Sequence, residues 1–204
     1  MATDAVVHLI DDDEGVRQAV AFLLTTSGFA VRVYESAAAF LDALPSVQPG
    51  CVVTDVRMPG MDGLALQREL KTRGVSQPVI VITGHADVPL AVEAMKAGAV
   101  DFIEKPFNDD VLLSAIRVAI DRHGRDTRHS EEIAAIKAKL ASLSPREREV
   151  LDGLVAGLPN KTIAYDLKIS ARTVEVHRAN LMTRMGARSV ADLVRMVFVV
   201  RSPV

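Results

Sequence analysis

The stretch that decides the fold reads Val6-Val7-His8-Leu9-Ile10-Asp11-Asp12-Asp13, an apolar run followed at once by three acidic residues. A short apolar run of this kind predicts a buried strand, and the carboxylates stand where the strand should end and a helix begin. Two later apolar runs end on chemically active residues, Cys51-Val52-Val53-Thr54 on Asp55 and Phe102-Ile103 on Lys105-Pro106. If these strands are parallel neighbours, their ends bring several carboxylates and one ammonium into a single pocket.

Residues 1–122 alternate such apolar runs with amphipathic segments. The first helix should end at Gly28, the second should follow a Ser36 cap, the third should stop near Gly74, and the fifth should run from Asp109 to about Arg122. Five successive βα units predict an α/β doubly wound fold, with a five-stranded parallel sheet covered by helices on both faces. Ligands of such sheets bind at the carboxyl ends of the strands.

The rest of the chain has a different character. Residues 123–141 are polar and then helix-favouring, which predicts a linker that is at least partly helical. Residues 142–204 contain no strand pattern and predict a small all-α domain of short helices. Ser144 followed by Pro145 and Glu147 is a strong helix start, and Asn160 and Ser170 are candidate caps for the next two helices, 161–167 and 171–185.

Composition limits the classes of protein that need considering. The chain has 204 residues, 49% of them hydrophobic and 25% charged, which is ordinary for a globular protein with a proper core. The single cysteine, Cys51, lies in an apolar run and cannot form an internal disulfide, which fits a reducing cytoplasm. The N-terminus lacks the features of an export signal and no stretch approaches the ~18 apolar residues of a membrane span, so we expect no membrane association.

Charge is distributed unevenly along the chain. Residues 1–122 carry 10 Lys and Arg against 17 Asp and Glu, a net charge of −7. Residues 123–204 carry 14 against 9, a net charge of +5. Only the second part therefore has the sign expected for a polyanionic partner such as DNA.

The residues at the strand ends suit phosphoryl chemistry. Mg²⁺ prefers oxygen ligands such as the carboxylates of Asp12 and Asp55, and a carboxylate can attack a phosphoryl donor when a metal and a cation neutralise the transferred oxygens. Asp55 is the candidate nucleophile, Lys105 the cation and Thr83 a hydroxyl donor. Each signal alone has a plainer explanation, since an acidic triplet is often a solvated helix N-terminus. The conjunction at four strand ends favours a site.

Residues 4–122 resemble the receiver domain of bacterial two-component response regulators, through Leu9-Ile10-Asp11-Asp12, Asp55-Val56-Arg57-Met58-Pro59-Gly60-Met61-Asp62-Gly63, Thr83-Gly84 and Lys105-Pro106. The resemblance implies that Asp55 is the phosphoacceptor. It also implies that Mg²⁺ is bound by Asp12, Asp55 and the backbone carbonyl of Arg57, with Asp11 assisting through water. Thr83 and Lys105 should contact the phosphoryl group, and Lys105-Pro106 should be a cis peptide. Phe102 matches an aromatic switch position, and its alternative is a plain core phenylalanine.

The segments 161–167 and 171–185 have helix-turn-helix proportions. Winding the second at about 100° per residue places Val174, Leu181 and Met185 on one stripe, which we expect in the core. The opposite side carries Arg172, Thr173, Val176, Ala179, Asn180 and Thr183. Small apolar and amide groups of this kind suit thymine methyls and base edges in the major groove. An isolated exposed valine is, however, also a common surface feature.

Residues 142–200 resemble the DNA-binding domain of the LuxR family, also called the FixJ/NarL family, through Leu143-Ser144-Pro145-Arg146-Glu147-Arg148-Glu149-Val150-Leu151, Gly157-Leu158-Pro159-Asn160-Lys161-Thr162-Ile163-Ala164 and Thr173-Val174-Glu175-Val176-His177-Arg178. The resemblance implies that Lys161 and Arg178 meet phosphates and that Thr173, Glu175 and Val176 face bases. Thr162, Arg172, Ala179 and Asn180 complete the expected interface. Glu175 stands where many relatives carry Lys, which leaves the target sequence open.

Three further stretches of the first part are informative: Gly84-His85-Ala86-Asp87-Val88-Pro89, Ala94-Met95-Lys96-Ala97-Gly98-Ala99 and Phe102-Ile103-Glu104-Lys105-Pro106-Phe107. Through them the chain as a whole resembles FixJ-type regulators of nitrogen fixation, which implies an oxygen-sensing, FixL-like histidine kinase as phosphoryl donor. The expected function is a phosphorylation-switched transcription activator that acts with promoter DNA and RNA polymerase. Phosphorylation should promote a homodimer through the face that carries Val88, Val92, Lys96 and Asp101. Two alternatives remain: a Mg²⁺-dependent phosphatase, and a constitutive DNA-binding protein whose first domain only oligomerises.

Overall fold

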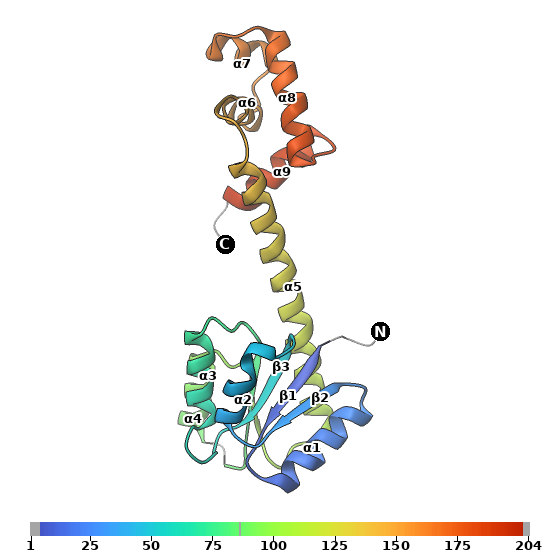
Figure 1. The fold of residues 1–204 in the computed structure, drawn as a ribbon, viewed down its shortest axis with the longest axis vertical. Helices are drawn as coiled ribbons and strands as arrows, with labels where there is room; N and C mark the ends of the chain where they lie inside the picture. Colours follow the sequence, from blue (N-terminus) through green and yellow to red (C-terminus); the bar gives the residue numbers. More distant parts are fainter. Residues whose placement is uncertain (1–4, 86, 202–204) are drawn as a thin grey trace. The chain divides into compact units, whose positions relative to one another are not determined.

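The structure, a computed structural model, describes residues 5–85 and 87–201. Its contacts divide the chain into two compact units, the first ending at Arg125 and the second beginning at Asp126 (Figure 1). The first unit contains β1 (Val6–Ile10), α1 (Glu14–Thr26), β2 (Ala30–Tyr34), α2 (Ala37–Ala43), a 3₁₀ turn (Leu44–Ser46), β3 (Gly50–Asp55), α3 (Gly63–Thr72), β4 (Val79–Thr83), α4 (Val88–Ala97) and β5 (Asp101–Glu104). The helix α5 (Asp109–Ala141) extends from the first unit into the second, which also contains α6 (Pro145–Val155), α7 (Asn160–Leu167), α8 (Ala171–Met185) and α9 (Val190–Arg201).

The sheet has the predicted five parallel strands, in the order β2-β1-β3-β4-β5. The chain reverses its direction of progress across the sheet at β1 and β3, which therefore flank the switch point where ligands of such sheets bind. The register pairs Ile10 of β1 with Thr54 of β3, so Asp11 and Asp55 follow at the same edge. The topology thus brings the acidic strand ends together.

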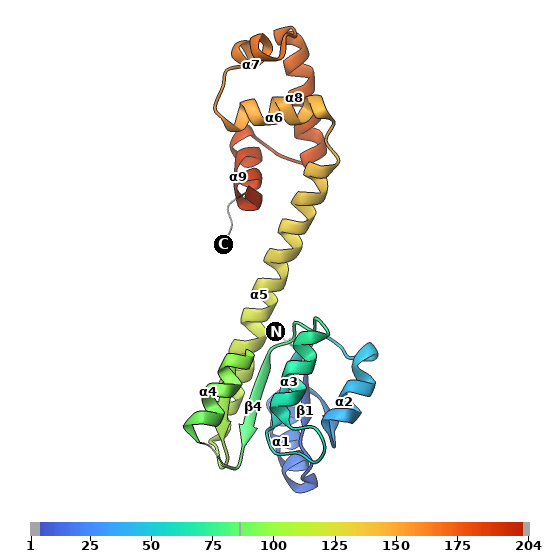
Figure 2. The ribbon, with the colours of Figure 1, turned by 90° about the vertical axis from the view of Figure 1, so that its left-hand side faces the viewer.

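Alternate strand residues face two separate cores. Val7 and Leu9 of β1 pack with α1 and α5, whereas Ile10 packs with α2, α3 and α4. Figures 1 and 2 show these two helical layers on opposite faces of the sheet. Burial on both faces explains the near-continuous apolar runs in the sequence. Cys51 is buried and free of any disulfide, as expected, and burial raises the pKa of its thiol to about 12.

The sequence pattern predicted that the fifth helix ends near Arg122, and this prediction is wrong. The helix continues to Ala141, so the whole segment 123–141 is helical. Gly124 is an isolated glycine, and a single glycine weakens a helix without ending it when no proline or capping residue follows. The early residues of α5, such as Ile116, pack on the sheet, while Ile136 packs within the second unit.

In its described part the second unit consists of helices joined by short connections, without strands, and it has its own core. Ser144 forms the predicted capping box with Glu147, and Ser170 caps α8 by accepting a hydrogen bond from the N–H of Thr173. Asn160 is not a cap, however, because Pro159 takes the extended cap conformation and Asn160 is the first helical residue. The predicted stripe of Val174, Leu181 and Met185 is fully buried in this core.

Candidate functional site

The acidic strand ends and Lys105 form one cluster at the carboxyl edge of the sheet. Asp11 follows β1, Asp55 ends β3 and Lys105 follows β5. The Nζ atom of Lys105 lies 2.7 Å from Asp11 Oδ2 and 2.7 Å from Asp55 Oδ1. Both carboxylates are buried, while the side chain of Lys105 keeps 20% of its surface exposed. The peptide bond between Lys105 and Pro106 is cis, as the resemblance implied.

Burial and charge oppose each other in this cluster. Burial raises the pKa of Asp55 above its usual value, and the hydrogen bond and charge of Lys105 hold that rise in check. Burial also works against the ammonium of Lys105, but its hydrogen bonds to Asp11 and Asp55 outweigh burial and raise its pKa. Lys105 thus partly offsets the effect of burial on Asp55 while it also binds Asp11.

Backbone groups fix the two carboxylates. The N–H of Arg57 donates to Asp55 Oδ2 at 2.6 Å, and the N–H of Asp13 donates to Asp11 Oδ1 at 2.9 Å. Asp55 therefore has one oxygen on a backbone donor and the other on Lys105. A carboxylate held on both sides in this way is oriented rather than free to rotate, which is what attack on an incoming group requires.

The donors expected for Mg²⁺ are all hard oxygen atoms, which suits this ion. Asp11 and Asp55 both bind the ammonium group of Lys105, whereas Asp12 is exposed. Within residues 5–85 and 87–201, no three His, Cys, Asp or Glu side chains converge to form a ready-made metal site. The residues fit the ion by their chemistry, and binding it would require the Asp12 side chain to join the other two.

Thr83 and Phe102 lie on the neighbouring strands. Thr83 is fully buried at the end of β4, where its hydroxyl is within 3.3 Å of both the backbone N–H and the carbonyl of His85. Its carbonyl accepts a hydrogen bond from the N–H of Lys105 at 2.7 Å, which links it to the cluster. Phe102 is partly buried against the core between the sheet and α2, α3 and α4.

Two residues that sequence reasoning missed support the cluster. The guanidinium of Arg17, in α1, donates to the carbonyl of Asp11 at 2.7 Å and to that of Asp12 at 3.3 Å. Gly63 begins α3 so close to Asp55 that a Cβ atom there would overlap the Asp55 carbonyl oxygen. The position of Arg17 just after the acidic triplet could have suggested its role, whereas the requirement at Gly63 is visible only in three dimensions.

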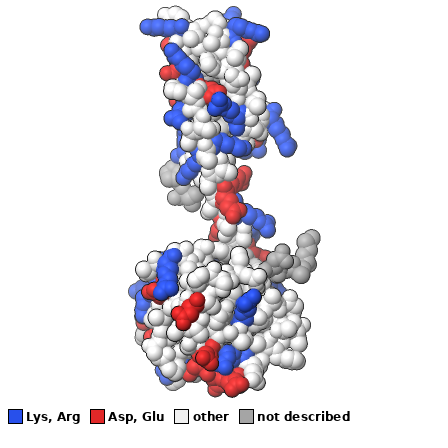
Figure 3. Space-filling view, in the orientation of Figure 1, with Lys and Arg blue, Asp and Glu red and all other residues white. Residues whose placement is uncertain are grey.

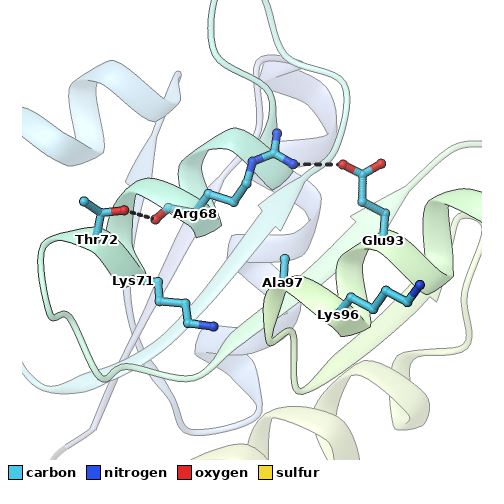
Figure 4. A pocket seen from close by; sticks show the side chains of 6 residues that line it. All are labelled: Arg68, Lys71, Thr72, Glu93, Lys96 and Ala97. Atoms are coloured by element: carbon cyan, nitrogen blue, oxygen red, sulfur yellow. Dashed lines mark hydrogen bonds and ion pairs between the residues drawn. The ribbon is translucent and has the colours of Figure 1, made fainter.

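The residues expected at the dimer face lie on α4 and β5. Val88 and Val92 are exposed at 77% and 44%, Lys96 is exposed, and Asp101 is partly buried. Lys96 also lines a separate cleft between α3 and α4, with Arg68, Lys71, Thr72, Glu93 and Ala97 (Figure 4). Arg68 pairs there with Glu93 at 2.8 Å. Lys71 and Lys96 occupy the last turns of their helices, where cations stabilise the helix dipole.

The helix pair α7 and α8 carries the residues expected to contact DNA. Val176 is 49% exposed, and its side of α8 also presents Glu175, Ala179 and Asn180 to solvent. Arg172 is exposed and lies 3.3 Å from Glu175 at the start of α8. Thr173 and Arg178 are partly exposed, and Lys161 and Thr162 are exposed on α7. All of these side chains are therefore accessible on one helix pair.

The two units differ in surface charge. In Figure 3 Lys and Arg predominate on the second unit, and acidic residues gather at the end of the first unit where the strands terminate.

Within residues 5–85 and 87–201, none of the helices combines the length and the apolar character needed to cross a bilayer.

Comparison with known families decides the assignment. Residues 7–117 match the response regulator receiver domain, and residues 141–197 match the bacterial regulatory proteins of the luxR family. The chain is a two-component response regulator with a LuxR-type DNA-binding domain. The predicted fold class and family are thereby confirmed.

The response regulator is similar over nearly its whole length to proteins named FixJ. It is 57% identical to the transcriptional regulatory protein FixJ of Azorhizobium caulinodans, over 93% of this chain and 90% of that protein. It is 56% identical to FixJ of Rhizobium meliloti, over 95% of each. Among solved structures, the response regulator StyR matches with a TM-score of 0.87 at 39% identity, covering 96% of this chain and 98% of that one. Full-length FixJ from B. japonicum matches with a TM-score of 0.63 at 50% identity, covering 97% and 98%.

Proposed function

We propose that Asp55 accepts a phosphoryl group from a histidine kinase and that this event switches promoter binding by the second unit. The observation that carries the proposal is the geometry at Asp55: a buried carboxylate at a strand end, held by a backbone N–H on one oxygen and by Lys105 on the other. The similarity to FixJ proteins supports a FixL-like, oxygen-sensing kinase as the donor. Residues 1–122, 123–141 and 142–204 then act as receiver, linker and DNA-binding domain.

In the transfer step, an oxygen of Asp55 attacks the phosphorus of the kinase phosphohistidine. A new O–P bond forms, the P–N bond breaks, and the imidazole leaves with its electron pair. Lys105 neutralises charge on the transferred oxygens, and Thr83 donates a hydrogen bond once its hydroxyl turns from His85. Mg²⁺, held by Asp12, Asp55 and the Arg57 carbonyl with Asp11 acting through water, would supply further charge neutralisation.

The added charge would favour the receiver conformation in which Thr83 and Phe102 have moved inward. We infer that this exposes or reshapes the face of Val88, Val92, Lys96 and Asp101 and promotes a homodimer. A dimer places two copies of α8 on half-sites of promoter DNA, where contact with RNA polymerase activates transcription. The exposed valines of α4 support this proposal because burying them would be favourable.

The decisive experiment compares the wild-type protein with Asp55→Asn and a matched control, Asp42→Asn, which removes an exposed carboxylate of α2. Each protein is treated with acetyl phosphate and Mg²⁺, then analysed by intact mass and by light scattering with promoter DNA. Wild type and Asp42→Asn should gain one phosphoryl group, dimerise and bind DNA more tightly. If Asp55→Asn responds equally, the phosphoacceptor is elsewhere and the proposal fails.

The dimer face has its own test. Val88→Glu should prevent phosphorylation-dependent dimerisation without reducing phosphoryl uptake, whereas Val33→Glu, at an exposed valine of the edge strand β2, should leave dimerisation intact. A constitutive DNA-binding protein would instead bind promoter DNA equally well with and without phosphoryl donor. That result would replace the switch with the simpler alternative.

A further inference from the structure

The three acidic side chains between β1 and α1 have different partners. Asp11 is buried, and one oxygen of its carboxylate accepts a hydrogen bond from the N–H of Asp13 at 2.9 Å. Asp13 is the N-cap of α1, and its own carboxylate accepts a hydrogen bond from the N–H of Val16 at 3.0 Å. The carboxylate of Asp12 is exposed, and no residue that the structure describes donates a hydrogen bond to it. Asp12 is therefore the member of the triplet whose side chain can still turn toward a metal ion.

Arg17 of α1 holds the backbone on both sides of Asp12. Its Nη1 atom donates to the carbonyl of Asp11 at 2.7 Å and to the carbonyl of Asp12 at 3.3 Å. These carbonyls belong to the two peptide groups that flank the Asp12 Cα atom. A hydrogen bond from a charged donor is stronger than one between neutral groups. The guanidinium therefore fixes the backbone from which the Asp12 side chain extends.

A fixed backbone at Asp12 favours metal binding. Asp12 has to join Asp11 and Asp55 around Mg²⁺, and with the backbone held only the torsion angles of the Asp12 side chain need to change. Without Arg17, the peptide groups of the triplet would have to be ordered as well, at a cost in backbone entropy. The two carbonyls that Arg17 binds are also occupied, which leaves the carboxylate as the group that Asp12 offers to the ion.

We propose that Arg17 is a positioning residue for the Mg²⁺ site. It does not bind the ion itself, but it holds the backbone of Asp12 so that the carboxylate can join Asp11 and Asp55 by side-chain rotation alone. This inference rests on the function proposed above, in which Mg²⁺ assists phosphoryl transfer to Asp55. Groups that orient the ligands of a metal without binding it commonly change metal affinity by about tenfold to a hundredfold.

The charge of Arg17 has the opposite effect on the ion. A guanidinium repels Mg²⁺, so an electrostatic effect alone would make the removal of Arg17 strengthen Mg²⁺ binding. Loss of positioning would weaken it. The direction of the change in affinity therefore separates the two roles.

The test measures the Mg²⁺ affinity of the full-length protein by isothermal titration calorimetry, without phosphoryl donor. Arg17→Gln should weaken Mg²⁺ binding about tenfold. Arg17→Lys keeps the charge, and an ammonium can donate to both carbonyls, but its geometry differs from that of a guanidinium. It should therefore weaken binding by only about twofold to threefold. Arg32→Gln is the matched control, because it removes an exposed arginine of β2 and should leave the affinity unchanged or slightly higher.

A double-mutant cycle shows whether Arg17 acts through Asp12. Asp12→Asn removes the charge of the positioned carboxylate and should weaken Mg²⁺ binding by itself. If Arg17 positions Asp12, Arg17→Gln should change the affinity by less than about twofold in the Asp12→Asn background. An arginine that only stabilises the fold would weaken binding by the same factor in both backgrounds. Thermal unfolding without Mg²⁺ checks that each variant is folded. If Arg17→Gln is not, Arg17→Lys decides, because charge alone predicts no change for it.

The outcomes distinguish this inference from the proposed function. If Arg17→Gln binds Mg²⁺ as tightly as wild type or more tightly, the inference is wrong, and phosphoryl uptake by Asp55 from acetyl phosphate still supports the function. If wild type takes up no phosphoryl group, the proposed function fails, and the Mg²⁺ affinities still decide the role of Arg17. If wild type binds no Mg²⁺, the inference is overturned.

Discussion

The ammonium of Lys105 lies 2.7 Å from the carboxylate of Asp55, and at the same distance from that of Asp11. The two acids come from sequence positions 44 residues apart, and Lys105 is a further 50 residues along the chain. The parallel sheet alone brings the three together. Because one cation serves two buried acids, its loss should affect both stability and chemistry.

Lys105→Met should lower the free energy of unfolding at neutral pH by about 3 kcal/mol, because it leaves two buried carboxylates without their cation. The pKa of Asp55 is already raised by burial, and removing Lys105 raises it further. A carboxyl group whose pKa is higher in the folded state than in the unfolded state contributes its full stability below the unfolded-state pKa. That stability is lost as the pH rises through the folded-state pKa. The deficit of the variant in thermal unfolding should therefore grow as the pH rises above the unfolded carboxyl pKa of 3.8. A deficit independent of pH would contradict this explanation.

Gly63→Ala should disturb the phosphoacceptor strand, because the added methyl group would overlap the backbone carbonyl of Asp55. Backbone there has to shift, which we expect to cost about 1–3 kcal/mol in unfolding free energy and to slow phosphoryl uptake from acetyl phosphate. Gly84→Ala is the control, since a Cβ atom at Gly84 meets no atom within 4 Å. Equal behaviour of the two variants in urea unfolding and uptake would show that the close approach at Gly63 has no consequence.

The sequence predicted the elements whose signals are local. The apolar run Val6–Ile10, the capping box at Ser144 and the core stripe through Val174 are all present in the structure as predicted. Asp11, Asp55 and Lys105 also converge, because a parallel βα array leaves little freedom in where its carboxyl ends lie, whereas Asp12 stays exposed outside this cluster.

Features that depend on tertiary context were missed. The support of Asp11 by Arg17 and the close approach of Gly63 to Asp55 depend on how helices dock on the sheet. The sequence pattern predicted that α5 ends near Arg122, two residues before Gly124. The helix instead continues through Gly124 to Ala141. The αL conformation of Lys168 has no local signal, because lysine is a poor predictor of that conformation.

Val174 and Val176 of α8 give a matched pair of substitutions. Val174 is fully buried and Val176 is 49% exposed. Val174→Ala should lower the unfolding free energy by about 1–3 kcal/mol through the cavity that it leaves. Val176→Ala should leave stability within about 0.5 kcal/mol but change which base pairs are preferred in a selection from random DNA sequences. Unchanged sequence preference would mean that Val176 is only an exposed hydrophobe.

Gly124→Ala tests whether α5 is one continuous helix in solution. A Cβ atom at Gly124 meets no neighbour, and alanine is favoured over glycine inside a helix by about 1 kcal/mol. We therefore expect a higher helix content by circular dichroism and a higher melting temperature. Gly28→Ala is the opposite control, because Gly28 has φ 90° and alanine should destabilise the protein there. A destabilising Gly124→Ala would mean that the linker is not helical at this point.

Glu147 connects the start of α6 to the end of α8. Its carboxylate accepts a hydrogen bond from the backbone N–H of Ser144 at 2.8 Å and lies 3.3 Å from the Arg184 guanidinium. The Ser144 backbone and hydroxyl lower the pKa of Glu147, with a further contribution from the charge of Arg184. A carboxyl group with a lowered pKa contributes stability at pH values above its unfolded-state pKa, which is near 4.5. That stability is lost as the pH falls through the folded-state pKa.

Glu147→Gln should therefore lower the unfolding free energy at pH 7 by about 1–2 kcal/mol, and the difference from wild type should shrink as the pH falls below about 4.5. Glu149→Gln is the control, since the pair that Glu149 forms with Arg146 is exposed and its loss should change stability by less than about 0.5 kcal/mol. Chemical denaturation of the full-length protein at several pH values measures both. If the deficit of Glu147→Gln were constant down to acid pH, the hydrogen bonds to Ser144 would not depend on the charge of the carboxylate.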